Sequence, residues 1–465
     1  MQRASEATSL LGEAAEPEVS LGVAGRERDD AGQAVFVYVI ATVMVVGMTA
    51  AVIFNYVMAA YLHRAYPYST FLFKPQDHFK DFYNVYDYAR QFKPGVSDNM
   101  VYSPVLHLFT DGLTLMPATV AFVLVVSAFF VSLLAVLWGW LTRPVHAKVA
   151  RLQLVAVFAL LSYPVLFAID RGNLEMVVFV LLALFFWLHY GRGSRLAWLP
   201  LSLAIAAKYY WLTLLVVLLS DRRYRQAIYA AVGAVAETLV SVLLLAWISG
   251  YSVVHVLHAL VQTLHGHVES TNTLFFAQHG HSLWGVVILI DRWTNGSLQM
   301  MNMQRVRELY MVLAVVLFGV VARQLLRYRH KPWQQATALV ACALLLPFED
   351  HDYTLIHLYL PLSLFMLTAR RGRRAWACAL LFAVCLVPWA YHDFTFSFWL
   401  WDASTSVLVY PAALLGLIVL ALLIGPAPAP SQAGAGAAPG LGADEARRFG
   451  AVADGGGVVP GDDEP

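Results

Sequence analysis

The sequence predicts an all-α polytopic membrane protein, a helical bundle of about ten spans that also holds one re-entrant helix pair. Of its 465 residues, 59% are hydrophobic and only 13% are charged, whereas soluble domains carry about 25% charged residues. Apolar runs of about 17 to 25 residues recur along the chain, and a helix of this length crosses a bilayer. The runs are continuous rather than alternating, which indicates helices and not the strands of a barrel.

Ten apolar segments are the candidate spans. They cover residues 35–61, 117–141, 152–169, 174–190, 227–248, 309–322, 335–347, 354–368, 375–391 and 405–424. The first follows a polar stretch and is too long for the apolar core of a signal peptide, so we expect it to anchor the chain. Residues 1–34 and the Ala/Gly/Pro-rich residues 425–465 are expected to be disordered tails on either side of a transmembrane domain at 35–424.

The segment 196–219 is apolar but is interrupted by Lys208. Each half has about 12 residues, which gives about 18 Å of helix at 1.5 Å per residue. Neither half can cross a hydrocarbon core of about 30 Å. The segment therefore predicts a re-entrant pair of half-helices with Lys208 near its apex, enclosed by protein or facing a water-filled cavity.

Five short basic loops predict how the chain is oriented. They hold Arg143, Lys148 and Arg151; Arg192 and Arg195; Arg222, Arg223 and Arg225; Arg323, Arg327, Arg329 and Lys331; and Arg370, Arg371, Arg373 and Arg374. If the segment 196–219 returns to its own side, all five loops lie on one face, which the positive-inside rule makes cytoplasmic. The protein is then a multi-pass plasma-membrane protein with both termini inside, and loops 62–116 and 249–308 are extracytoplasmic.

Two acids, Asp77 and Asp81, follow the first span within the stretch QDHFKDFYNVYDYARQF. They are four residues apart, so on a helix they would share one face, with Tyr88 nearby. They can be solvated acids of a loop helix, or one of them can be a general base at the membrane surface. The sequence leaves open which of the two acids that base would be.

Further along, two charged stretches interrupt the apolar pattern. The stretch Asp170-Arg171-Gly172-Asn173 lies between two spans and can be an ordinary turn with a local ion pair. Glu175 comes one residue into the next helix, which favours a buried polar role. Lys208 lies within apolar sequence, where a lysine marks a pathway, an ion pair or a bound anion.

Histidines are frequent in the second half of the chain. His281 and His351 are candidates for hydrogen bonding and charge balance at a phosphate or sugar, and three acids around His351 should favour its imidazolium form. The paired histidines lack the helical spacing of zinc hydrolases. The three cysteines, Cys342, Cys378 and Cys385, lie in apolar segments and have no metal-site spacing. We expect neither a metal nor a cofactor.

Six motifs follow one another in order along the chain: Asp81-Phe82-Tyr83 with Tyr88-Ala89 and Gly95, Val101-Tyr102-Ser103-Pro104, Arg171-Gly172-Asn173, Ala204-Ile205-Ala206-Ala207-Lys208-Tyr209, His281-Ser282-Leu283-Trp284-Gly285, and Pro347 to His351. This ordered set resembles the polyprenyl-phosphate-mannose-dependent mannosyltransferase-like family, glycosyltransferase family eighty-seven of the GT-C superfamily. The chain departs from the family where His281 replaces a Gln, where Trp211 replaces a Pro, and where acids replace the Trp before the late histidine.

The resemblance implies a GT-C-like bundle and an inverting glycosyl transfer on the extracytoplasmic face. The donor would be a hexose, with mannose favoured, on polyprenyl phosphate, and the acceptor a lipid or glycan; membrane lipids are the other expected partners. Asp81 would accept the proton of the acceptor hydroxyl, and His351 would orient the acceptor or relay the proton. The remaining expected site residues are Lys208, Arg171 and His281 at the donor phosphate, and Asp77, Tyr88, Asn173 and Tyr102 at the substrates.

Two other classes of function stay open from the sequence. A secondary transporter would also carry charged residues near the membrane, with Lys208 on an ion or substrate path. A non-catalytic partner in envelope assembly would share the architecture without the chemistry. Nucleic-acid binding is not expected, because the net charge is only +1.

Overall fold

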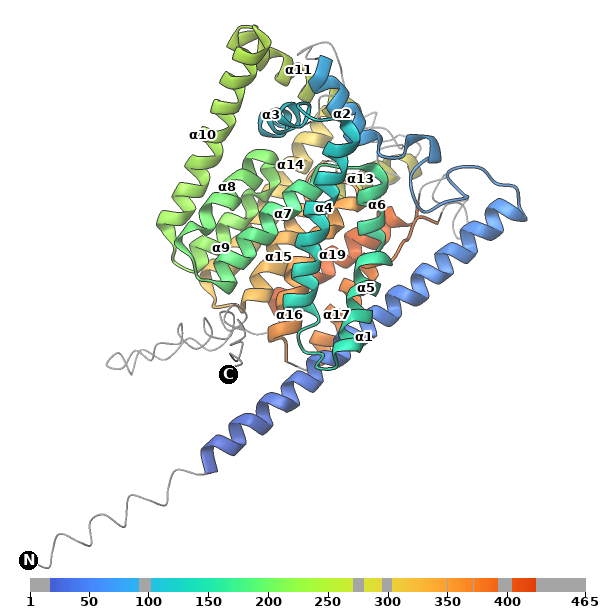
Figure 1. The fold of residues 1–465 in the computed structure, drawn as a ribbon, viewed down its shortest axis with the longest axis vertical. Helices are drawn as coiled ribbons and strands as arrows, with labels where there is room; N and C mark the ends of the chain where they lie inside the picture. The colour runs from blue at the N-terminus through green and yellow to red at the C-terminus, as the bar shows by residue number, and fades with distance from the viewer. Residues whose placement is uncertain are drawn as a thin grey trace, which may run out of the picture.

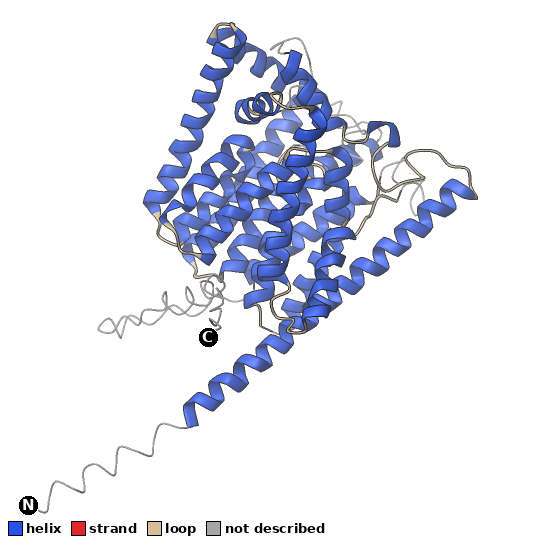
Figure 2. Cartoon of the chain, in the orientation of Figure 1, coloured by secondary structure: helices blue, strands red, loops and turns tan. Residues whose placement is uncertain are grey.

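The fold is a bundle of helices in the part of the chain that the structure describes. The computed structural model describes residues 17–91, 102–270, 280–294, 303–348, 350–370, 372–391 and 404–423. Within these ranges the helices are joined by turns, and the one extended pairing is an isolated antiparallel bridge between Gly280 and His351 (Figure 2). The expected all-α class is confirmed.

The first part of the chain runs from α1 to α10 (Figure 1). Its helices are α1 (Pro17–Ala60), η1 (Pro75–Asp77), α2 (Lys80–Gln91), α3 (Pro104–Leu113), α4 (Ala118–Val136), η2 (Leu137–Leu141), α5 (Lys148–Leu160), α6 (Tyr163–Arg171), α7 (Glu175–Phe186), η3 (Trp187–Gly191), η4 (Arg195–Ala197), α8 (Trp198–Ala207), η5 (Tyr209–Leu214), α9 (Leu215–Ser220) and α10 (Tyr224–Ser249). The first helix begins at Pro17, well before the predicted start of the first span at Val35.

The second part of the chain runs from α11 to α19 and includes the buried helix α15. Its helices are α11 (Val253–Ser270), α13 (Leu283–Trp293), α14 (Met303–Arg327), α15 (Pro332–Leu345), η7 (Asp352–Leu358), α16 (Tyr359–Thr368), α17 (Arg373–Leu386) and α19 (Ser406–Leu423). In α15 every residue from Trp333 to Leu345 is buried. The predicted tail 425–465 lies outside the described residues.

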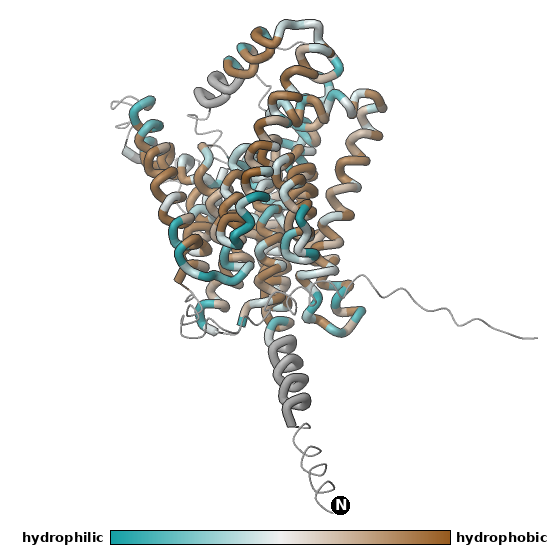
Figure 3. The backbone as a smooth tube through the Cα atoms, turned by 90° about the vertical axis from the view of Figure 1, so that its left-hand side faces the viewer, coloured by the Kyte–Doolittle hydropathy of each residue, from teal (hydrophilic) through white to brown (hydrophobic). Residues whose placement is uncertain are grey.

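The predicted count of ten spans is not confirmed. Within the described residues, five helices are long and apolar enough to cross a membrane, or six if the bent pair α5–α6 counts as one span. Among the long helices, α14 and α10 lie at the periphery, with only 17% and 28% of their apolar windows buried inside the protein, whereas 50% of the window of α19 is buried. Several predicted spans form shorter, buried helices such as α15 and α16. Figure 3 shows apolar residues along the helices and hydrophilic residues mainly near their ends.

The chain folds back at Lys208, as the interrupted apolar segment predicts. Lys208 is extended, with φ −145° and ψ 106°, between α8 and η5. At the other end of this hairpin, the side chain of Arg223 donates to the carbonyl of Ser194 at 3.5 Å. His189 Nε2 lies 2.8 Å from Asp221 Oδ2 at the same end. The two halves therefore start and finish side by side, and Lys208 lies at the turn between them.

One end of the bundle carries α2, α3 and α11, and the turns before α5 and α10 lie at the opposite end (Figure 1). At the first of these ends, Asp77 and Asp81 do not share a helix. Asp77 closes the short helix η1, whereas Asp81 lies in the first turn of α2, which begins at Lys80. Phe79, between them, has φ 56° and breaks the helical path. The one-face arrangement expected from their spacing is therefore wrong.

A glycine at the end of α6 allows α2 to approach closely. Gly172 adopts a left-handed conformation, with φ 64° and ψ 34°, and ends α6 directly after Arg171. A Cβ atom at this position would lie 3.0 Å from Phe82 Cβ and 3.2 Å from Phe79 Cα. Glycine is therefore required both by the backbone conformation and by the space.

We expect Gly172→Ala to destabilise the protein more than Gly250→Ala. Both residues have positive φ, so each alanine incurs about 1 kcal/mol or more of backbone strain. Only Gly172 is also crowded, because nothing lies within 4 Å of the position of a Cβ at Gly250. Thermal unfolding in detergent checks this difference, and equal losses in the two variants would contradict the close packing of α6 against α2.

Candidate active site

The carboxylate of Asp81 lies at the centre of a polar network at the end of the bundle that carries α2. Arg171 Nη2 donates to Asp81 Oδ1, and Arg171 Nε donates to Oδ2 at 3.3 Å. Asn173 Nδ2 donates to the same Oδ2 at 2.9 Å. The Asp81 side chain remains 18% exposed, so it is held by three hydrogen bonds and still reaches the surface.

The guanidinium of Arg171 faces protein on several sides. Its Cζ lies 3.9 Å from the centre of the Phe73 ring, in a cation–π contact. Nη1 points toward the carbonyl of Asp77 at 3.5 Å. The side chain is 13% exposed. Arg171, expected at the donor phosphate, is thus engaged with Asp81 in the structure, and its neighbour Asp170 pairs with His78 instead.

Asn173 connects Asp81 with the apex of the hairpin. Its Nδ2 also lies 3.1 Å from Tyr102 Oη, and Lys208 Nζ lies 5.0 Å from the centre of the Tyr102 ring. The Asn173 Oδ1 atom accepts from the backbone N–H of Glu175, the first residue of α7, at 3.0 Å. Five of the residues singled out in the sequence, Asp81, Tyr102, Arg171, Asn173 and Lys208, thus form one continuous set.

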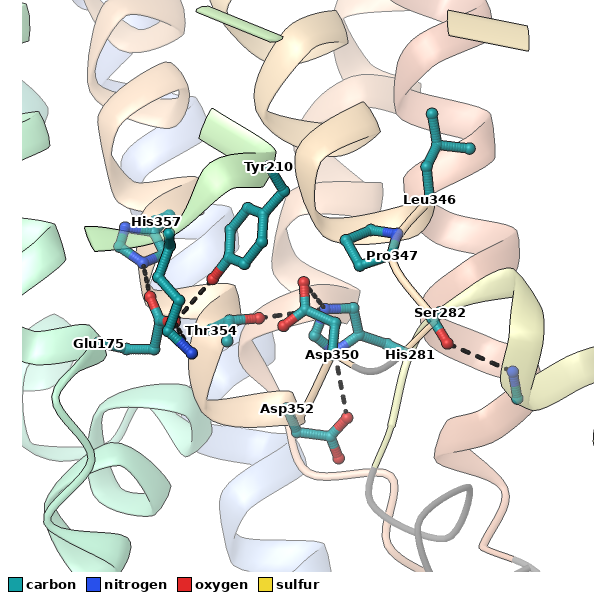
Figure 4. Close-up of polar contacts among 12 residues, drawn as sticks. Glu175, Tyr210, His281, Ser282, Leu346, Pro347, Asp350, Asp352, Thr354 and His357 are labelled. Atoms are coloured by element: carbon teal, nitrogen blue, oxygen red, sulfur yellow. Dashed lines mark hydrogen bonds and ion pairs between the residues drawn. The ribbon is translucent and has the colours of Figure 1, made fainter. Parts of the chain in front are cut away.

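Beneath Lys208 lies a buried carboxylate. Lys208 Nζ is 3.4 Å from Glu175 Oε1, and the Lys208 side chain is 22% exposed while that of Glu175 is 1% exposed. Tyr210 Oη donates to Glu175 Oε1 at 2.6 Å, and His357 Nε2 lies 3.0 Å from Oε2 (Figure 4). The expectation of a buried polar role for Glu175 is confirmed.

A second buried network surrounds His281. Its Nδ1 lies 3.4 Å from Asp352 Oδ1, and its Nε2 lies 3.6 Å from Asp350 Oδ2 (Figure 4). Thr354 Oγ1 lies 3.2 Å from the same Nε2, and Tyr163 Oη donates to Asp352 Oδ2 at 3.0 Å. The helix η7 supplies groups to both networks, because it carries Asp352 and Thr354 as well as His357.

This arrangement favours the charged form of His281. Burial by itself lowers the pKa of the imidazole, but the carboxylates of Asp350 and Asp352 outweigh it and raise the pKa to about 9. The acids 350 and 352, expected to charge His351, thus face His281. His351 is half-buried and pairs through its backbone with Gly280. His281 is 0% exposed, so its predicted contact with a donor phosphate requires movement of the groups that enclose it.

Two predicted substrate residues lie at the edge of the Asp81 network. Asp77 pairs with Lys80 at 2.9 Å and has a side chain that is 23% exposed; the hydrogen bond from Lys80 lowers the pKa of Asp77. Tyr88 is half-buried on α2, two turns beyond Asp81.

Tyr210 and His357 were assigned no role from the sequence, although an ionisable residue within an apolar segment is the signal that marks such positions.

The fold and this site together define a multi-pass helical membrane protein with a carboxylate and two cations gathered at one end of its bundle. A family model described as glycosyltransferase family 87 matches residues 100–348, more than half of the chain. The chain belongs to glycosyltransferase family 87. No curated protein and no solved structure matches it. The matched range contains Tyr102, Arg171, Asn173, Lys208 and His281 and ends before His351, while Asp77, Asp81 and Tyr88 precede it.

We expect the stability of the protein to fall as the pH rises from 6.5 through about 9, the range between the ordinary pKa of histidine and that of His281. A group whose pKa is raised on folding stabilises the folded state fully below its unfolded pKa and loses that contribution above its folded pKa. In His281→Gln this component should disappear, and in a control at the exposed His255 it should remain. A wild-type unfolding midpoint that stays level over this range in detergent would contradict the charged cluster.

Proposed function

We propose that this protein transfers a hexose from a polyprenyl-phosphate donor to a lipid or glycan acceptor on the extracytoplasmic face, with inversion at the anomeric carbon. Family membership supports glycosyl transfer. The observation that carries the rest is that an oriented, partly exposed carboxylate, Asp81, is linked to Lys208 through hydrogen bonds of Asn173 to Asp81 and Tyr102 and the cation–π contact of Lys208 with Tyr102. Mannose is the favoured sugar, by resemblance to the family.

Asp81 is the proposed general base. The acceptor hydroxyl forms a bond to the anomeric carbon while its proton passes to the Asp81 carboxylate. The bond from that carbon to the donor phosphate breaks, and its electron pair leaves with the phosphate oxygen. Because the acceptor attacks directly, a single displacement inverts the configuration. Hydrogen bonds from Arg171 and Asn173 hold the carboxylate in one orientation, which such a displacement needs.

Lys208 is the proposed phosphate-binding cation. An ammonium group has three N–H donors, and the contact with Glu175 engages one side of it. At 22% exposure the group faces both the buried carboxylate and the open side of the network. Charge develops on the departing phosphate oxygen, so a fixed cation at that position lowers the barrier. Arg171 and His281 are proposed to add to the positive potential around the phosphate from positions farther from it than Lys208.

The other predicted residues take supporting positions in this proposal. His351 lies next to the buried His281 network on the bridge to Gly280, and we propose that it orients the acceptor or relays the proton. Tyr102 and Asn173 line the path between Asp81 and Lys208. Asp77 and Tyr88 are proposed at the outer edge of the acceptor site. Apolar surfaces next to the hairpin would hold the isoprenoid chain.

We expect Asp81→Asn to lose at least about 100-fold in transfer rate, because general-base catalysis contributes about 10²- to 10⁴-fold. Asp77→Asn should lose less, since Asp77 is paired with Lys80 and lies outside the Asp81 carboxylate contacts. The measurement is release of polyprenyl phosphate by purified protein in nanodiscs, from a panel of polyprenyl-phosphate sugars offered with membrane lipid extract.

The same panel also tests the donor and the reaction class. Sugar-selective release that Asp81→Asn abolishes, in protein whose unfolding midpoint is unchanged, supports both the base and the donor. Full activity of Asp81→Asn together with inactivity of Asp77→Asn would move the base to Asp77. No release from any donor by folded wild-type protein would favour a transporter or a non-catalytic assembly partner.

A further inference from the structure

We propose that Glu175 sets the charge of the donor site, so that the lipid phosphate produced by the transfer is bound about as tightly as the donor. Glu175 would act through Lys208 without touching either substrate, as a residue that determines phosphate specificity and product release. This inference rests on the proposed function, because it takes Lys208 as the cation at the donor phosphate.

The first support is the geometry of the ion pair. Glu175 is 1% exposed, so its carboxylate cannot contact a ligand, whereas Lys208 is 22% exposed and lies only 3.4 Å away. The carboxylate is also held by Tyr210 at 2.6 Å and by His357 at 3.0 Å. A buried charge fixed in this way acts at close range on whatever anion Lys208 binds, because little water screens it.

The second support is the balance of charges around the site. Three positive groups are expected around the phosphate, and each faces at least one carboxylate. Lys208 faces Glu175, Arg171 faces Asp81, and His281 faces Asp350 and Asp352. The positive groups therefore do not exceed the carboxylates in this part of the site. A site selected for the tightest possible phosphate binding would carry an excess of cations.

The consequence follows from the charges of the two ligands. A polyprenyl-phosphate sugar is a phosphodiester with one negative charge, whereas the released polyprenyl phosphate is a monoester with about 1.5 to 2 negative charges at neutral pH. Coulomb energy is proportional to ligand charge. The negative charge of Glu175 therefore makes the binding free energy of both ligands less favourable. The effect on the product is about 1.5 to 2 times the effect on the donor.

The experiment compares two ligands with the same short isoprenoid chain, a phosphate monoester and its methyl diester. Their dissociation constants are measured by calorimetry in detergent, for the wild-type protein, Glu175→Gln and Lys208→Ala. Glu237→Gln is the matched control, since Glu237 is a half-buried glutamate on α10 that accepts a hydrogen bond from Ser202 at 2.8 Å and does not contact Lys208.

In Glu175→Gln we expect the preference for the monoester over the diester to rise about tenfold relative to wild type. Glu237→Gln should leave that preference unchanged. If Glu175 serves only to support the fold, its replacement weakens the binding of both ligands equally, and that outcome overturns the proposal. A lower preference for the monoester in Glu175→Gln overturns it as well.

The wild-type protein provides a second test that does not depend on a folded variant. We expect it to bind the monoester no more than about threefold more tightly than the diester, and a preference above about tenfold would contradict a balanced site. Failure of the proposed function looks different: wild type would then bind neither ligand, or Lys208→Ala would bind both as tightly as wild type.

Discussion

The ion pair between Lys208 and Glu175 is the interaction on which the arrangement of the site depends. A charged group enclosed in an apolar bundle is costly unless a partner of opposite charge and further hydrogen bonds accompany it. Lys208 lies at the turn of the α8–α9 hairpin, and Glu175 is the first residue of α7. Their contact fixes the depth of the hairpin relative to α7. Tyr210 and His357 then complete the set, which brings η5 and η7 to the same place.

The rest of the site is built from interruptions in helices. Arg171 ends α6, Gly172 turns the chain in a left-handed conformation, and Asn173 accepts from the backbone N–H of the first residue of α7. Asp81 lies in the first turn of α2, which packs closely against this turn. Helix ends expose backbone groups and side chains that a continuous apolar span would direct into lipid. The polar groups of this site therefore lie where its helices begin and end.

Much of this set could be predicted from the sequence, because polar residues in apolar surroundings stand out. Lys208, Arg171, Asn173, Tyr102 and Asp81 were all candidates, and the structure brings them together. The partners of those residues were harder to predict. The acids at 350 and 352 were expected to charge their neighbour His351, yet they face His281, which lies about seventy residues away in the chain. Proximity in sequence is a weak guide where loops from different helices interleave.

The helical class, the apolar segments and the break at Lys208 follow from the sequence alone, since composition and hydrophobic run length are local properties that water and lipid act on directly. Three other features appear only in the folded protein: the pairing of each cation with its carboxylate, the separate helices of Asp77 and Asp81, and the burial of several apolar segments as short helices. These features depend on contacts between segments far apart in the chain, and no local pattern encodes such contacts.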